Sequence, residues 1–132
     1  MSMAKQEWID QAVAMLDKAY VPYSKFPVGA CLVTEDEKLY TGINIENASF
    51  GLTNCAERTA FFKAVSEGEK QFKHLVVAGN TEGPISPCGA CRQVMAEFCA
   101  PDMPVTLVGK NGVTKEMTVA ELLPYMFTSD EL

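Results

Sequence analysis

Three cysteines and one glutamate are spaced as a catalytic metal site requires. Cys88 and Cys91 are separated by two residues, about one helical turn or one tight loop, so both sulfurs can reach one metal ion. Cys55 lies upstream, and Glu57 follows it after a single spacer residue. Zinc is the default candidate for such ligands. Because three thiolates leave the fourth position of a tetrahedral zinc open for water, the pattern indicates a catalytic site.

Each motif also has an interpretation without catalysis. A Cys-x-x-Cys pair occurs in redox motifs and in structural zinc sites, and Asn54 with Glu57 could simply cap a helix. A structural zinc module that binds a protein partner would use Cys55, Cys88 and Cys91 plus one more ligand. The sequence offers no convincing fourth cysteine or histidine. The joint occurrence of three cysteines and a carboxylate therefore favours the catalytic interpretation.

Hydrophobic periodicity and turn signals predict four helices and five strands that would position these residues. We expect helices from about 5 to 20, 55 to 67, 88 to about 98 and 118 to 123. The expected strands cover 28–33, 39–45, 74–79, 105–108 and 113–117. Asn111-Gly112 is a strong hairpin signal, and Thr118 with Glu121 forms a capping box. The order predicts an α/β fold in which a mixed five-stranded sheet has helices on both faces.

Two of the predicted helices begin at the cysteines. Cys55 lies in the first turn of the second helix, and Cys88 opens the third. The positive ends of both helix dipoles and the free backbone N–H groups would then point at the sulfurs, which lowers their basicity. This would compensate for the negative charge that three thiolates place around one zinc ion.

Helical spacing groups residues on one side of each helix that carries a cysteine motif. In the second helix, Thr59, Phe62 and Val65 fall on one side. In the third helix, apolar residues follow Cys91 at positions i+3, i+4 and i+7, so one face carries both a ligand and core residues. These apolar residues are Val94, Met95 and Phe98.

Length and charge restrict the possible functions. The chain of 132 residues fits one domain, residues 1–132, without internal repeats. Its 11 basic and 17 acidic residues give a net charge of -6, which provides no basic surface for a polynucleotide. The N-terminus lacks the apolar core of a signal peptide, and no apolar run approaches membrane length. We therefore expect a cytoplasmic protein without nucleic-acid or membrane partners.

The remaining two cysteines and the one histidine are predicted to have no part in the metal site. Cys31 lies in an apolar run and Cys99 at a helix end, so we expect small core residues and no disulfide partners. His74 lies at the start of a strand, far in sequence from the cysteine motifs. It is predicted to be structural or exposed, and no metal ligand.

The Cys-x-Glu and Pro-Cys-x-x-Cys motifs together resemble the small, three-cysteine form of cytidine deaminase. Ile45–Asn47 upstream and Arg58 after the glutamate add to the resemblance. It is clear from about Phe26 to Phe98 and weaker from Glu121 to Phe127. It implies the cytidine deaminase fold, a three-layer αβα arrangement. It also implies Zn²⁺-dependent hydrolysis of cytidine and deoxycytidine to uridine or deoxyuridine and ammonia, in pyrimidine salvage.

The resemblance implies a role for each site residue. Cys55, Cys88 and Cys91 would bind zinc, and Glu57 would move protons between water and the base. Arg58 would hydrogen-bond the ligand thiolates, with a surface salt bridge as its alternative. For the base, the resemblance implies contacts from the Phe26 ring and from the backbone N–H of Ala56, which would donate to the base carbonyl. Asn44 and Glu46 would bind the ribose hydroxyls. The resemblance also implies a homotetramer in which active sites are completed across subunits, with Phe127 as the contributing residue.

One departure and one alternative remain within the family. Phe50 stands where family members often carry tyrosine, which removes a hydroxyl near the site. The alternative substrate is a cytosine-bearing nucleoside antibiotic such as blasticidin S. The run Asn44–Asn47 favours the ordinary nucleoside, because an amide and a carboxylate together can donate to and accept from vicinal hydroxyls.

Overall fold

The computed structural model describes residues 4–132 and contains the predicted order of helices and strands. Met1, Ser2 and Met3 lie outside the described residues. The N-terminal stretch that was expected to lack a signal peptide begins with these three residues. The elements are α1 (Gln6–Ala14), β1 (Val28–Thr34), β2 (Leu39–Ile43), α2 (Ala56–Ser66), β3 (Phe72–Gly79), α3 (Gly89–Phe98), β4 (Pro104–Val108), β5 (Thr114–Thr118) and α4 (Val119–Leu122).

The five strands form one mixed sheet in the order β2-β1-β3-β4-β5. β3 and β4 are parallel, with Val77 opposite Leu107, and the other neighbouring pairs are antiparallel. A parallel pair needs a crossover connection, and α3 provides it. The predicted hairpin joins β4 to β5, where Asn111 and Gly112 both adopt positive φ, at 60° and 76°.

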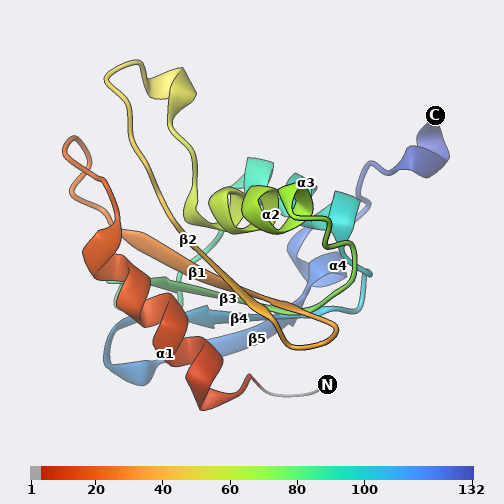
Figure 1. Ribbon diagram of the computed structural model, residues 1–132, viewed down its shortest axis with the longest axis horizontal. Helices are drawn as coiled ribbons and strands as arrows, with labels where there is room; N and C mark the ends of the chain where they lie inside the picture. Colours follow the sequence, from red (N-terminus) through yellow and green to blue (C-terminus); the bar gives the residue numbers. More distant parts are fainter. Residues whose placement is uncertain (1–3) are drawn as a thin grey trace.

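Helices cover both faces of the sheet, as predicted (Figure 1). On one face α1 packs across β1 and β3, over a small cluster that includes Trp8, Ala12 and Val76. On the other face α2 and α3 lie side by side over a larger cluster that includes Phe61 and Met95. The two cysteine motifs begin α2 and α3, so the chemistry predicted from the sequence belongs to this second face.

The side of α2 that carries Thr59, Phe62 and Val65 is not its buried face. Phe62 is exposed and the other two are only partly buried, whereas the helix fully buries Phe61. Phe61 packs edge-on against Phe72, with ring centroids 5.6 Å apart. The other buried residues of this face are Ala56, Glu57, Ala60 and Ala64.

His74 is fully buried under α1. Its Nε2 lies 2.7 Å from the Thr106 hydroxyl, and that hydroxyl donates to the Glu116 carboxylate, 2.7 Å from Oε1. Trp8 packs against the imidazole ring with centroids 5.2 Å apart. Burial, and then the charge of Lys73, lower the pKa of His74 to about 4. The histidine is therefore a structural residue, one of the two options predicted for it.

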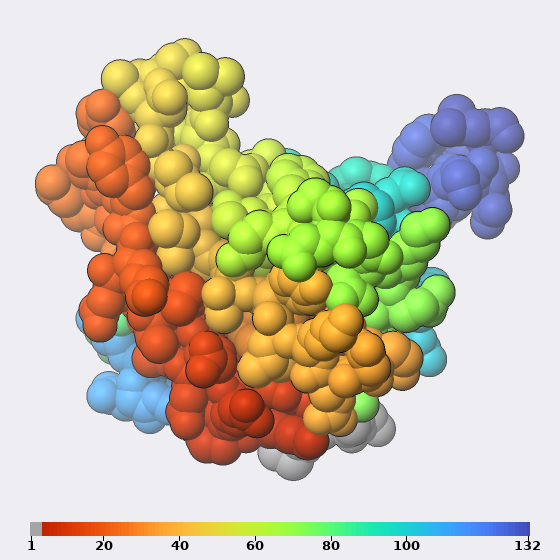
Figure 2. All heavy atoms as spheres, in the orientation of Figure 1, coloured from red at the N-terminus to blue at the C-terminus, as the bar shows by residue number. Residues whose placement is uncertain are grey.

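Two segments project from the body of the protein (Figure 2). One is the arm around the short 3-10 helix Phe50–Leu52, and the other is the C-terminal tail after α4. Both carry exposed apolar side chains: Phe50 is 69% exposed, Leu52 70% and Phe127 57%. In residues 4–132, each helix is too short or too polar to cross a membrane.

Candidate active site and metal centre

Three sulfurs meet where α2 and α3 begin. Cys55 is the N-cap of α2, Cys88 is the N-cap of α3, and Cys91 follows in the first turn of α3. The Sγ atoms of Cys55 and Cys88 are 3.6 Å apart, those of Cys88 and Cys91 are 3.4 Å apart, and all three lie within 4.8 Å of one another. Tetrahedral zinc with bonds of about 2.3 Å would separate its sulfurs by about 3.8 Å. The three thiols therefore fit a zinc ion.

The surroundings of the sulfurs favour thiolates. Cys55 and Cys88 are the N-caps of their helices, and neither side chain occupies the backbone N–H groups of the first turn, so the positive end of each helix dipole favours a thiolate there. Arg58 Nη2 donates to Cys55 Sγ at 3.2 Å. A hydrogen bond from the Cys91 thiol, followed by Arg58, lowers the pKa of Cys55 to about 5 against the effect of burial. The same pairing raises the pKa of Cys91. A divalent cation among the sulfurs would allow both to ionise.

Glu57 lies beside the sulfurs in the first turn of α2. It is only 3% exposed. Burial, with a smaller contribution from the charge of Cys55, raises the pKa of Glu57 to about 7, against an ordinary value of 4.5. The proposed capping role for Asn54 and Glu57 is wrong, because Cys55 is the N-cap and Asn54 instead donates to Thr59 Oγ1 at 3.1 Å. Glu57 therefore has no capping partner that would explain its burial.

A cavity of about 190 Å³ opens beside this cluster. Its wall joins the two cysteine motifs to the loop before β1 and to the end of β2. It therefore combines metal ligands, a buried carboxylate and an aromatic ring in one space. The lining residues are Phe26, Val28, Asn44, Cys55, Ala56, Glu57, Ile85, Ser86 and Cys88.

Comparison with known proteins agrees with this geometry. Residues 2–107 match the family model described as the cytidine and deoxycytidylate deaminase zinc-binding region. This chain belongs to that deaminase family. It is 56% identical over 130 residues to a cytidine deaminase of Sporosarcina psychrophila, covering 98% of this chain and 96% of the relative.

A solved structure extends the match to the fold. The crystal structure of a cytidine deaminase from Burkholderia pseudomallei superposes with a TM-score of 0.91 at 49% identity, covering 95% of this chain and 100% of that one. A more distant relative, a blasticidin-S deaminase of Bacillus cereus, is 33% identical over 113 residues and covers 80% of this chain and 79% of its own. The predicted deaminase fold is confirmed.

Two predicted ribose contacts of this deaminase lie near the cavity, and each also holds the loop before β1. Asn44 accepts from the Val28 N–H at 2.9 Å and donates to the Phe26 carbonyl at 2.9 Å. These bonds fix the backbone of Phe26, whose ring is predicted to contact the base. One amide N–H and one acceptor position of Asn44 remain for a ligand. Phe26 itself is partly exposed at the cavity.

Glu46 lies outside the cavity lining of the deaminase. Its Oε1 accepts from the backbone N–H groups of Tyr23 at 3.0 Å and Ser24 at 3.1 Å, and its Oε2 accepts from the Ser24 hydroxyl. The Ser24 hydroxyl, more than any other partner, lowers the pKa of Glu46. A carboxylate has about four acceptor positions, so one remains on Oε2 for a substrate hydroxyl.

Phe127 is not brought to the site within one chain. It lies in the projecting tail, outside the cavity lining, and its carbonyl accepts from Gln93 Nε2 at 3.0 Å. Two residues that the sequence analysis did not select do reach the site: Ile85 and Ser86 line the cavity just before the second cysteine motif. The sequence spacing could not identify these two residues, because they lie in an irregular segment between β3 and α3 that has no helical or strand periodicity.

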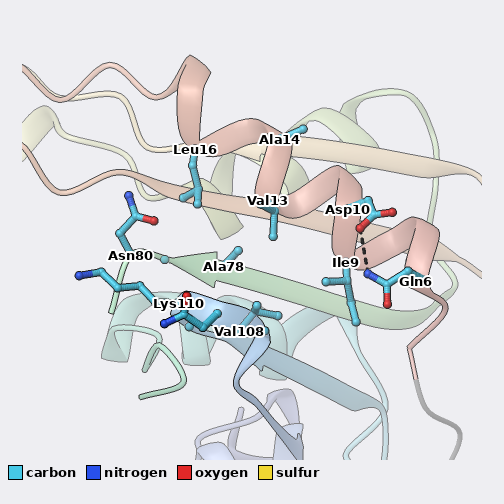
Figure 3. Close-up of a pocket in the computed structure, with 14 residues that line it drawn as sticks. Gln6, Ile9, Asp10, Val13, Ala14, Leu16, Ala78, Asn80, Val108 and Lys110 are labelled. Carbon is cyan, nitrogen blue, oxygen red and sulfur yellow. Dashed lines mark hydrogen bonds between the residues drawn. The ribbon is translucent and has the colours of Figure 1, made fainter. Parts of the chain in front are cut away.

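A larger cavity of about 620 Å³ lies on the opposite face of the sheet (Figure 3). Ile9, Val13 and Leu16 face it from the first helical segment, while Val108 and Lys110 face it from the end of β4 and the turn that follows. Its lining contains none of the three site cysteines. The size of a cavity therefore does not locate the chemistry in this deaminase.

Proposed function

We propose that this deaminase hydrolyses cytidine and deoxycytidine to uridine or deoxyuridine, releasing ammonia in pyrimidine salvage. The observation that carries the proposal is the buried Glu57 in the wall of the same cavity as Cys55 and Cys88. A structural zinc site needs no buried carboxylate beside an opening. Two relatives that match this chain over nearly its whole length are named cytidine deaminases.

The chemistry of the reaction assigns the central work to Glu57. Zinc held by Cys55, Cys88 and Cys91 would supply the positive charge that lets a water molecule ionise near neutral pH. In the net reaction the oxygen of a water molecule would add to C4 of the base, the bond from C4 to the exocyclic nitrogen would break, and the nitrogen would leave as ammonia. Glu57 would carry the first water proton to N3, where it stays, and then the second, from the hydroxyl formed on C4, to the leaving nitrogen.

Other residues of the chain orient the substrate. Phe26 would pack on the base, and the Ala56 N–H, free at the start of α2, would donate to the base carbonyl. Asn44 and Glu46 would bind the ribose hydroxyls with the positions that their loop contacts leave open. Arg58 would hold Cys55 Sγ as a thiolate.

Two other functions are less well supported. A structural zinc module would need a fourth ligand, whereas the metal-ligand cluster found within residues 4–132 comprises three cysteines. Deamination of blasticidin S would fit the same chemistry, but the relative with that name is 33% identical, against 56% for a cytidine deaminase. The nucleoside is therefore the favoured substrate.

Incubation of the purified, zinc-loaded protein with four compounds tests the proposal. Loss of ultraviolet absorbance and chromatography of the products would follow cytidine, deoxycytidine, cytosine and blasticidin S. We expect fast conversion of the two nucleosides and hardly any conversion of the bare base. Equal turnover of cytosine and cytidine would contradict the ribose contacts, and faster turnover of blasticidin S would replace the proposed substrate.

The proposed assembly is a homotetramer in which Phe127 of one subunit completes the active site of another. Two segments that project from the body of the protein support it (Figure 2), because they carry the exposed side chains of Phe50, Leu52 and Phe127, which a second subunit could cover. Sedimentation of the active protein should show four chains. A fully active monomer would contradict this assembly.

The proposed location is the cytoplasm. All five cysteines are free thiols, which suits a reducing compartment, and a zinc site built from thiolates depends on such conditions. Fractionation of cells followed by immunoblotting should place the protein with cytoplasmic markers.

A further inference from the structure

Arg92 joins three separate segments of the chain beside the second cysteine motif. Its Nε donates to the Pro87 carbonyl at 2.8 Å, its Nη1 to the Leu122 carbonyl at 2.7 Å and its Nη2 to Ser86 Oγ at 2.7 Å. Each nitrogen of the guanidinium thus has a partner, and all three partners are uncharged oxygen atoms. Arg58, the other arginine of the chain, instead contacts a sulfur directly.

Cys88 needs such support more than Cys55 does. The residue before Cys55 is held by two backbone hydrogen bonds between Asn54 and Ile45, at 2.9 and 3.0 Å, and the Cys55 carbonyl accepts from Thr59 Oγ1 at 3.1 Å. Cys88 follows an irregular segment that contains Pro87 and lies outside the helices and strands. The side-chain bonds that hold the turn before Cys88 come from Arg92.

The third contact of Arg92 gives this turn a fixed support. Leu122 ends α4, and its side chain is buried. The same helix is attached to the rest of the fold by backbone bonds from Val119 to Met103 at 3.1 Å and from Ala120 to Pro101 at 2.9 Å. A planar guanidinium holds several acceptors in one fixed arrangement, so the position of α4 is transmitted to the turn.

We propose that Arg92 is a positioning residue for the zinc ligand Cys88 and for the cavity wall at Ser86. It locks the Ser86–Pro87 turn against α4, so that Cys88 Sγ stays within reach of the other two sulfurs. The inference rests on the proposed zinc site and adds a residue that does not touch the metal. Removing groups that orient metal ligands typically costs about 10- to 100-fold in metal affinity.

The rate of zinc release from the whole protein tests this role. A colorimetric chelator in excess would report release from wild type, Arg92→Met, Arg92→Lys and Ser86→Ala. We expect Arg92→Met to release zinc about 10- to 100-fold faster than wild type. Arg92→Lys should release zinc nearly as fast as Arg92→Met, because an ammonium keeps the charge but cannot reach three acceptors. Ser86→Ala, which removes one bond of three, should show a smaller acceleration in the same direction.

Two control variants separate positioning from general stability. Thr34→Ala removes a hydroxyl at the end of β1, which accepts from the Lys38 N–H at 2.9 Å and donates to Asp36 Oδ1 at 2.6 Å. It should destabilise the fold by about 1 kcal/mol without touching α4 or the turn before Cys88. Gln93→Ala removes the neighbouring bond to the tail, at the Phe127 carbonyl. Both should release zinc at the wild-type rate. Thermal unfolding of every variant would show how much stability each has lost.

The outcomes distinguish this inference from the proposed function. If wild type binds no zinc, the proposed function fails. If wild type binds zinc and the Arg92 variants release it no faster, or no faster than Thr34→Ala at equal loss of stability, the positioning role is wrong. Should Arg92→Met not fold, Arg92→Lys and Ser86→Ala decide, and wild-type release rates in both would overturn the inference.

Discussion

Glu57 and His74 are ionisable side chains buried on opposite faces of the sheet, and of the two only Glu57 lines a cavity. Glu57 lies under α2 in the wall of the cavity that Cys55 and Cys88 also line. His74 lies under α1 and is sealed between Trp8 and Thr106. Burial shifts both toward the neutral form, raising the pKa of Glu57 to about 7 and lowering that of His74 to about 4. A shifted pKa is therefore no sign of catalysis by itself.

The difference lies in what each group can exchange protons with. The Thr106 hydroxyl donates to Glu116, so it accepts from His74 Nε2, and the histidine is held as a donor in a closed chain of hydrogen bonds. Glu57 faces a cavity beside the cluster of Cys55, Cys88 and Cys91. Access to a cavity and neighbouring thiols therefore distinguish Glu57, the proposed catalytic residue, from the structural His74.

Loss of a metal ligand should produce the largest effect. Wild type should hold one zinc per chain, and Cys91→Ala should lose both zinc and activity, because two thiolates do not make a tight site. Cys31→Ala is the matched control, since Cys31 is equally buried but lies on the α1 face. It should keep its zinc. Metal analysis and cytidine turnover check both variants, and full zinc in Cys91→Ala would refute the ligand assignment.

Loss of a ribose contact should have an intermediate effect. Glu46→Ala should lower kcat/KM for cytidine by about 10- to 100-fold, as expected when a hydrogen bond to a charged group is lost. Its zinc content should not change. Steady-state kinetics and metal analysis measure the two quantities.

The control for Glu46 is Ser24→Ala, because Glu46 also holds the loop that carries Phe26. This variant removes the hydroxyl that donates to Glu46 and accepts from the Phe26 N–H at 3.0 Å, but it keeps the carboxylate. We expect it to lose less than Glu46→Ala. An equal loss would show that Glu46 acts by holding the loop and not by binding ribose.

Replacement of His74 should have the smallest effect, confined to stability. Its folded pKa of about 4 lies below the ordinary 6.5, so the unfolded chain binds more protons between these values. Stability from the buried neutral ring is present above pH 6.5 and falls as the pH drops toward 4. Between pH 7.5 and 5.5 this contribution should fall by about 1 kcal/mol.

Urea unfolding of wild type and His74→Gln at these two pH values measures the contribution. Glu116, Lys73 and the other charged groups remain in both proteins, so only the difference between the two pH slopes reports His74. The variant should show the smaller slope and should deaminate cytidine at the wild-type rate. Identical slopes would mean that the imidazole titrates equally in the folded and unfolded chains.

Much of the fold could be predicted because its signals are local. The Asn111-Gly112 turn and the Thr118 capping box were both confirmed, and both depend on residues within a few positions of each other. The buried face of α2 could not be predicted from the sequence pattern, for a physical reason. Phe61 and Phe62 are adjacent, and the other buried residues of the helix are three alanines and Glu57, so its large apolar residues do not define a single face.

In the candidate site, too, residues marked by a local sequence pattern were predicted and those with distant partners were not. The three cysteines and Glu57 were predicted from spacing, and the structure brings them together. Arg92 was missed, because its partners are two backbone carbonyls and a serine, one of them thirty residues away, and no sequence pattern marks such acceptors. The place of Phe127 depends on a second chain in our proposal, and thus remains a prediction.

The turnover of zinc-loaded Glu57→Gln with cytidine tests the central claim most directly. Glutamine fills the same volume and should leave fold and zinc content unchanged, but its amide cannot take a proton from water or return one to N3. Loss of general acid-base help typically lowers rates by about 10²- to 10⁴-fold, and a residue used in several proton transfers should reach at least the upper end. We therefore predict a folded, zinc-loaded and almost inactive variant. A variant that keeps most of its turnover number would contradict the assignment of Glu57 as the proton carrier.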